Sequence, residues 1–286
     1  MLDLLLDSAL DAILDTLKLL PFLFLAYLLI ELLENRAEEK TINMIHRAGR
    51  CGPLIGSALG VIPQCGFSAA TANLYAGGII TRGTLIAVFL STSDEMLPIF
   101  ISRSVPASFI LKVLAFKFIA GMIAGFVIDF IGRRRGVRSD KELHDICELE
   151  GCNCEEGVLR SALFHTVKIS VFLLLTCFLI NVAVGAVGEE HLGNFILNRP
   201  VLGELLAGLV GLIPNCAASV IITELYLQGG MSAGAMISGL LVGAGVGLLV
   251  LFRQNRLNLR ENLISLGTLY VSGVFFGMVA SLLPIF

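Results

Sequence analysis

The sequence predicts an all-α polytopic membrane protein built from two five-segment inverted repeats. Two observations support this fold class. Of the 286 residues, 56% are hydrophobic and only 15% are charged, whereas soluble domains carry about 25% charged residues. The charges are also uneven, since 13 lie between Gly132 and Arg160 but only six lie between Leu163 and Phe252. A soluble fold cannot cover its surface with so few polar groups, so we expect helices that span a bilayer.

The second observation is an internal duplication. Gly52–Tyr75 aligns without gaps on Gly203–Tyr226 with nine identities in 24 positions, which include Pro63/Pro214 and Cys65/Cys216. The flanking segments align in the same order, so each half repeats the same elements. This alignment predicts a first repeat at residues 1–131, a charged linker at 132–160 and a second repeat at 161–286.

Each half reads as five hydrophobic segments. They lie near 10–33, 51–64, 66–80, 83–102 and 108–131 in the first half, and near 162–184, 201–215, 217–229, 232–252 and 262–284 in the second. The first, fourth and fifth segments of each half are long enough to cross about 30 Å of hydrocarbon. The second and third are shorter and are separated by a Pro-x-Cys break. We therefore expect each short pair to be re-entrant, which is typical of transporter sites.

Lys and Arg predict the orientation, because they favour the cytoplasmic side. With the N-terminus outside, most of them fall on one face, and little beyond Lys18, Arg103 and Arg199 falls on the other. We expect a multi-pass protein of the plasma membrane with both termini outside and the 132–160 linker in the cytoplasm. An odd number of crossings per half then inverts the second repeat relative to the first. The pairs Gly121/Gly125 and Gly273/Gly277 predict close helix packing.

The break residues are the main candidates for substrate binding. Cys65 and Cys216 occupy equivalent positions, and their thiolates suit soft metals and metalloids; the alternative is that both cysteines only pack as small apolar residues. The neighbouring amides and hydroxyls either satisfy broken-helix backbone or line a polar cavity. The complete candidate set is Pro63, Gln64, Cys65, Ser68, Pro214, Asn215, Cys216 and Ser219.

Acidic residues within apolar segments are candidates for coupling to an ion or proton. Asp94 and Glu95 lie in the fourth segment, and Glu224 lies in a short segment where the first half has Asn73. The alternative is that these acids pair with Lys112, Lys117 or backbone. In the linker, His144, Cys147, Cys152 and Cys154 form a cluster that either captures a soft metal in the cytoplasm or belongs to a plain acidic linker.

At the duplicated breaks Ile62–Gly66 and Ile213–Ala217, with a Cys-bearing linker between the halves, the chain resembles the ten-transmembrane heavy-metal exporters. Members are often labelled arsenic efflux proteins, and some are proposed manganese transporters. The resemblance covers essentially the whole chain and implies a permease that moves a metal or metalloid outward. It carries over Pro63, Cys65, Pro214 and Cys216. Larger organoarsenical permeases place a second Cys close to this break, where this chain has Gly66-Phe67 and Ala217-Ala218.

The sequence thus predicts a secondary active exporter of a heavy-metal ion or a thiophilic metalloid such as arsenic. The alternative is a permease for manganese or another hard divalent cation, which prefers oxygen ligands, or for a small organic anion. We expect no enzyme and no built-in cofactor, because a P-loop, a C-x-x-C motif and a haem-ligand histidine pair are all absent from the sequence. The expected partners are the lipid bilayer and the small ion itself. The net charge of −3 gives no indication of nucleic-acid binding, and a homodimer is left open.

Overall fold

The computed structural model describes residues 8–14, 16–17, 20–21, 23–25, 27–28, 51–62, 65–93, 96–134, 158–187 and 201–283. Every regular element in these ranges is a helix. Five helical stretches among them are long and apolar enough to cross a membrane. The prediction of an all-α polytopic membrane protein is therefore confirmed at this level. Residues 135–157, most of the predicted linker, lie outside the described ranges.

The helices form the same series twice. Where the chain is described, helical residues between 8 and 28 precede five α-helices in the first half, and α9 precedes five α-helices in the second. The first series is α3 (Gly52–Gly60), α4 (Cys65–Ala76), α5 (Arg82–Ser91), α6 (Met96–Ser102) and α7 (Ala107–Arg134). The second is α9 (Val158–Val187), α11 (Leu202–Gly211), α12 (Cys216–Leu227), α13 (Ala233–Val242), α14 (Gly247–Gln254), the short 3₁₀ helix η2 (Arg256–Asn258) and α15 (Leu259–Leu282).

The turns that begin α5 and α13 are built alike. Gly78 and Gly229 reverse the chain after α4 and α12 with φ of 71° and 76°, a conformation that glycine adopts without a steric penalty. The N-cap residues Thr81 and Ser232 then accept hydrogen bonds from the backbone N–H groups three residues later, at 3.1 and 3.2 Å. Both caps satisfy donors that a helix start leaves free.

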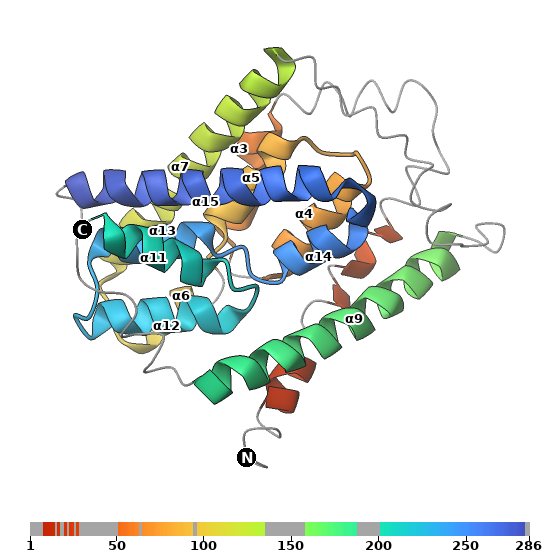
Figure 1. Cartoon of the computed structure of the whole chain (residues 1–286), viewed down its shortest axis with the longest axis horizontal. Helices are drawn as coiled ribbons and strands as arrows, with labels where there is room; N and C mark the ends of the chain where they lie inside the picture. Colours follow the sequence, from red (N-terminus) through yellow and green to blue (C-terminus); the bar gives the residue numbers. More distant parts are fainter. Residues whose placement is uncertain are drawn as a thin grey trace.

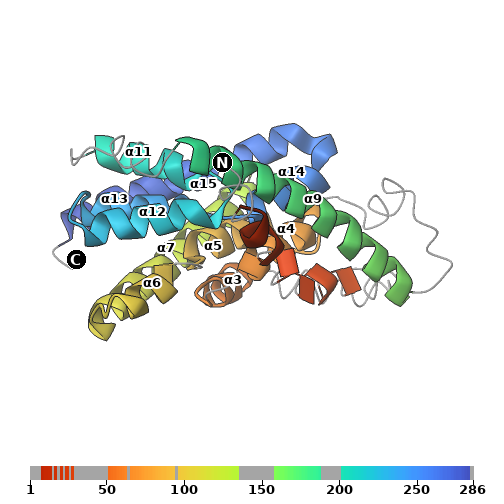
Figure 2. The same ribbon diagram turned by 90° about the horizontal axis from the view of Figure 1, so that it is seen from below.

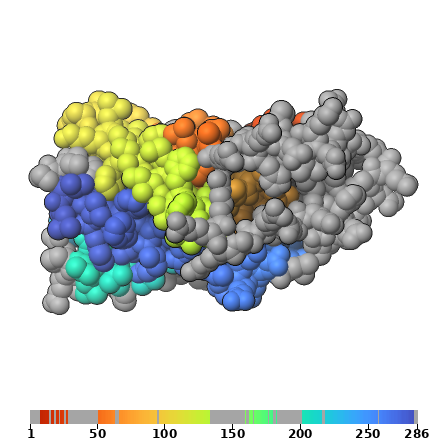
Figure 3. Space-filling model, turned by 90° about the horizontal axis from the view of Figure 1, so that it is seen from above, coloured from red at the N-terminus to blue at the C-terminus, as the bar shows by residue number. Residues whose placement is uncertain are grey.

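Helices α5 and α13 lie in the centre of the molecule. Every residue from Gly83 to Ser91 and from Gly234 to Val242 is buried. The α5 helix packs against α3 and α7, and α13 packs against α11 and α15. Figures 1 and 2 show α9 running along the outside of this bundle. Seen from above, α7 and α15 border each other on one face (Figure 3). Phe116 of α7 and Phe276 of α15 make an edge-to-face contact with centroids 6.5 Å apart.

The peripheral helices expose large apolar side chains. Leu111 on α7, Leu179 on α9 and Val271 on α15 are each about two-thirds exposed, at 65%, 67% and 65%. A bilayer solvates exposed apolar side chains of this kind. Together with the five helical stretches of spanning length, they indicate a multi-pass membrane protein.

The small residues of α7 and α15 hold these helices against the central pair. A Cβ at Gly121 would lie 2.7 Å from the carbonyl oxygen of Ala87, and a Cβ at Gly277 would lie 2.4 Å from Ser238 Cβ. No larger residue fits at these distances unless the helices separate. The packing role predicted for the paired glycines is confirmed.

Candidate functional site

The interior contains two helix interruptions that the sequence analysis did not predict. The fourth segment of each half has the spanning length and hydropathy that the sequence analysis expected, but it is not one continuous helix. Instead, α5 ends at Ser91 and α6 begins at Met96, while α13 ends at Val242 and α14 begins at Gly247. Hydropathy is insensitive to such a break because the residues on both sides remain apolar. Each half therefore has two pairs of short helices separated by an interruption. They are α3–α4 and α5–α6 in the first half, and α11–α12 and α13–α14 in the second.

The interruptions of the two halves have different chemical causes. Thr92, at the end of α5, has an extended ψ of 129°. Its hydroxyl donates to Val88 O at 2.8 Å, and the Ser93 hydroxyl donates to Ser91 O at 3.0 Å. Side-chain hydroxyls thus bond to backbone carbonyls of the last turn of α5. In the second half Gly245 takes a φ of 53°, a left-handed conformation that favours glycine.

The helices that follow the interruptions pack against the other half. The α14 helix contacts α4, and α6 contacts α12. A Cβ at Gly247 would lie 2.9 Å from the Cβ of Ser68, which is fully buried. The first turn of α14 therefore lies against the first turn of α4. As a result, the interruption of the second half lies beside the start of α4 in the first half.

The predicted break residues fall at or beside helix starts. Cys65 is the first residue of α4, and Cys216 is the first residue of α12. Asn215 is buried and is the N-cap of α12, whereas Ser219 and Pro214 are half-buried. The other predicted positions, Pro63, Gln64, Asp94, Glu95 and the side chains of Cys65 and Cys216, lie outside the described residues, so their roles stay predictions.

Lys117 reaches both interrupted central helices. It lies on α7, is 1% exposed, and donates from Nζ to Thr92 O and, at 2.9 Å, to Leu240 O. Thr92 follows α5 in the first half, and Leu240 lies in the last turn of α13 in the second. The sequence analysis considered Lys117 only as a partner for the acids. Two features of the sequence could have indicated the helix breaks, namely the polar run Ser91-Thr92-Ser93 and the glycine-rich run 243–247. A helix break leaves backbone carbonyls that need a hydrogen-bond donor such as Lys117.

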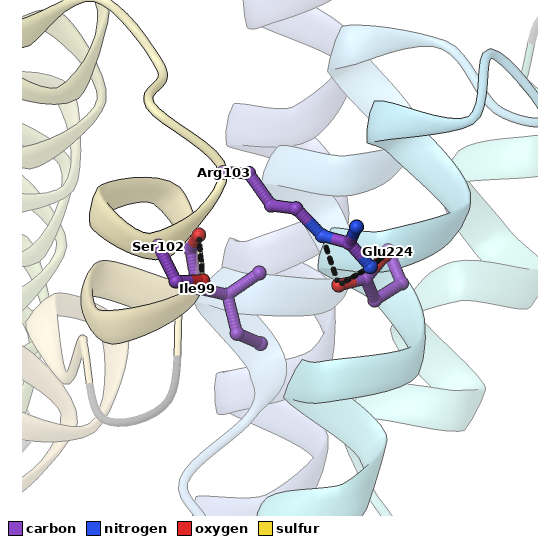
Figure 4. Close-up of polar contacts among 4 residues, drawn as sticks. All are labelled: Ile99, Ser102, Arg103 and Glu224. Carbon is purple, nitrogen blue, oxygen red and sulfur yellow. Dashed lines mark hydrogen bonds and ion pairs between the residues drawn. The ribbon is translucent and has the colours of Figure 1, made fainter.

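Glu224 joins α12 to the end of α6. Arg103 Nη2 lies 2.9 Å from Glu224 Oε2 and 3.0 Å from Oε1, and Arg103 Nε lies 3.1 Å from Oε1 (Figure 4). The sequence analysis gave Lys112, Lys117 or backbone as the alternative partners of the three acids, and Glu224 pairs with Arg103 instead. The error arose because α6 and α12 belong to different halves, and nothing in the sequence aligns them.

The position in α4 aligned with Glu224 is Asn73, and it makes the corresponding contact with neutral groups. The Tyr27 hydroxyl donates to Asn73 Oδ1 at 3.3 Å and accepts from Nε2 of Gln254, the last residue of α14. Tyr27 and Asn73 are 2% and 1% exposed. A neutral buried link thus joins α4 to α14, where an ion pair joins α12 to α6.

No group of three or more His, Cys, Asp or Glu side chains that could hold a metal occurs among the residues whose placement is described. The predicted capture cluster of His144, Cys147, Cys152 and Cys154 lies in the undescribed part of the linker. What the described site offers is backbone polar groups at helix ends, hydroxyls and amides in a dry interior, and one lysine.

Residues 1–174 match the model of a protein family whose description reads "Putative, 10TM heavy-metal exporter". This match covers more than half of the 286 residues. The chain belongs to this family. Comparison with curated proteins and with solved structures gives no match. The membership agrees with the resemblance noted from the Pro-x-Cys breaks, and it makes the chain a membrane transporter of the heavy-metal exporter class.

Proposed function

We propose that the protein is a secondary active transporter that exports a thiophilic metal ion or metalloid, such as arsenite, across the plasma membrane. The observation that carries this proposal is the pairing of short helices across the two halves, α4 with α14 and α12 with α6. All four helices begin at an interruption. Non-helical backbone at membrane depth is tolerated only where it is buried in protein or lines a cavity, and paired broken helices are the usual substrate site of transporters.

Thiols at the ends of these helices suit soft ions. Cys65 and Cys216 begin α4 and α12, and a helix N-terminus stabilises a thiolate over a thiol. Thiolates prefer soft metals and metalloids over hard cations. Gln64, Ser68, Asn215 and Ser219 supply polar groups beside the two thiols in the proposed site.

Alternating access between two inverted halves is the proposed mechanism. The duplicated helix order and the cross-half pairing suit two halves that rock about a shared centre. In this arrangement both termini lie outside and the 132–160 linker lies in the cytoplasm, as the Lys and Arg distribution favours. Asp94 and Glu95, which follow Thr92 in the sequence, are proposed to carry the proton exchanged for substrate.

Uptake into inside-out membrane vesicles tests the proposal. Vesicles with the wild-type protein are expected to accumulate arsenite or Cd²⁺ when a proton gradient is applied. The Cys65→Ser/Cys216→Ser variant should lose this uptake. The matched control is Cys51→Ser/Cys177→Ser, which removes one exposed and one buried cysteine away from the breaks and should transport normally. Equal uptake by both double variants would contradict the thiol site.

A hard divalent cation such as Mn²⁺ is the second candidate substrate. The buried oxygens of Ser91, Thr92 and Ser93 beside the α5 interruption favour it, because hard cations prefer oxygen ligands. In this case Mn²⁺ uptake should be abolished by Asp94→Asn and should survive the loss of both break cysteines. Arsenite uptake that depends on the cysteines would exclude this candidate.

A further inference from the structure

Lys117 is an almost fully buried lysine in the described part of the bundle. Lysine is rarely fully buried unless it is paired, and charged side chains at membrane depth are costly and usually functional. The side chain is 1% exposed on the long helix α7, which packs glycines against α5. The aligned position on α15 is Leu269, which is fully buried. The duplication therefore supplies a single lysine at a place where the other half has a leucine.

Among the described residues, Lys117 donates to two backbone carbonyls from different halves. Thr92 O lies directly after the last turn of α5, and Leu240 O lies in the last turn of α13, 2.9 Å from Nζ. Carbonyls at a helix C-terminus have no partner within the helix, and the partial negative charge there favours a cation. Lysine has hydrogen-bond donors and no acceptor, so it suits two such carbonyls at once.

Lys117 joins the two helix ends through their backbone. The carbonyls of Thr92 and Leu240 accept from its Nζ, so the lysine holds the residue that follows α5 and the last turn of α13. The α5 and α13 helices are in direct contact, and each leads into a short helix that packs against the other half. A bond that joins their ends therefore controls how the two halves meet at the centre.

We infer that Lys117 is a positioning residue for transport, which couples the two halves by bonding the ends of both interrupted helices. Its role in transport rests on the proposed function, whereas its role in joining the helix ends does not. Loss of the hydrogen bonds from Lys117 to Thr92 O and Leu240 O should loosen both interruptions together, although these lie far apart in the sequence. Loss of an ordinary packing side chain would instead loosen its own helix first.

Hydrogen–deuterium exchange of the purified protein tests this inference without a substrate. In Lys117→Met, which keeps the length and apolar body of the side chain, amides in 88–93 and 239–246 should both exchange on the order of tenfold faster than in the wild type. Lys117→Arg keeps the donors and should stay within about threefold of the wild type. The matched control is Lys112→Met, an exposed lysine on the same helix, which should change neither segment.

Unchanged exchange at either interruption in Lys117→Met would overturn the inference. If Lys117→Met does not accumulate in the membrane, Lys117→Arg decides: accumulation with wild-type exchange supports the inference, and failure of both variants overturns it, since shape rather than donors is then required. In inside-out vesicles with arsenite as the probe, Lys117→Met should lower the maximal rate at least about tenfold with an unchanged KM. A wild-type protein that moves no arsenite would contradict the proposed substrate, and the exchange result would still decide the role of Lys117.

Discussion

The two cross-half contacts occupy aligned places and use opposite chemistry. At one, Arg103 and Glu224 form a two-pronged ion pair whose side chains are 60% and 27% exposed. At the other, Tyr27 bridges the amides of Asn73 and Gln254, and Tyr27 and Asn73 are almost completely buried. The packing of α6 against α12 is thus repeated by the packing of α14 against α4. The side chains that connect the two helices differ between the two places.

This difference shows which features a duplication constrains. Helix order and close glycine packing recur in both halves because the bundle cannot form without them. The end contacts are free to differ because either a salt bridge or a buried hydrogen bond joins two helices. An exposed ion pair weakens with salt, whereas a buried neutral bond does not. We therefore expect the Arg103–Glu224 contact to weaken as the salt concentration rises, and the Tyr27 contact to be insensitive to salt.

The shared packing gives the largest expected effect. Gly125→Leu and Gly277→Leu add side chains where there is no room for them. The added Cβ alone would lie 2.7 Å from Gly83 O at position 125 and 2.4 Å from Ser238 Cβ at position 277. Each substitution should lower the free energy of unfolding by about 3 kcal/mol, measured as the melting midpoint in detergent. The controls are Gly132→Leu and Gly267→Leu, where nothing lies within 4 Å of the added Cβ. A loss in one half only would show that the halves do not share this packing.

The buried neutral contact gives the next effect. Tyr27→Phe removes the hydroxyl that bonds both Asn73 and Gln254, and Asn73 Nδ2 already has no partner among the described residues. Buried amides without partners cost about 1–3 kcal/mol. The melting midpoint should fall by the same amount at low and at high salt. A salt-dependent loss would contradict the neutral character assigned to this end.

The ion pair gives the smallest effect. Glu224→Gln should lower stability by about 0.2–1 kcal/mol at low ionic strength, and high salt should erase most of this difference. The charge-swapped variant Arg103→Glu/Glu224→Arg should recover the wild-type midpoint, whereas either single reversal should not. A large loss that is insensitive to salt would assign Glu224 a role beyond this pair, such as the predicted ion coupling.

Apolar segments and the duplication predicted the all-helical, membrane-spanning character of the chain and the order of its described helices. Apolar segments and the aligned Gly52–Tyr75 and Gly203–Tyr226 stretches were sufficient for the helix order, because membrane burial makes hydropathy a direct measure of location. They missed the breaks after Ser91 and Val242, since an interrupted apolar segment has the same hydropathy as a continuous one.

The cross-half contacts were beyond prediction for a different reason. Nothing in the local sequence around Arg103 or Gln254 specifies a partner more than a hundred residues away. For the same reason Lys117 could not be assigned to two carbonyls, because any backbone carbonyl is chemically equivalent until the fold selects it. The Pro-x-Cys positions were recognisable only because the duplication repeats them.

The central claim is that both break cysteines lie in one site that opens alternately to the two sides of the membrane. The direct measurement is labelling of variants that retain a single cysteine, Cys65 or Cys216, with a membrane-impermeant maleimide applied to right-side-out or inside-out vesicles. The account predicts that each cysteine is labelled from both sides and that arsenite slows the labelling, while a variant that retains only the buried Cys177 stays unlabelled. Labelling of each cysteine from one side only, unaffected by arsenite, would contradict it.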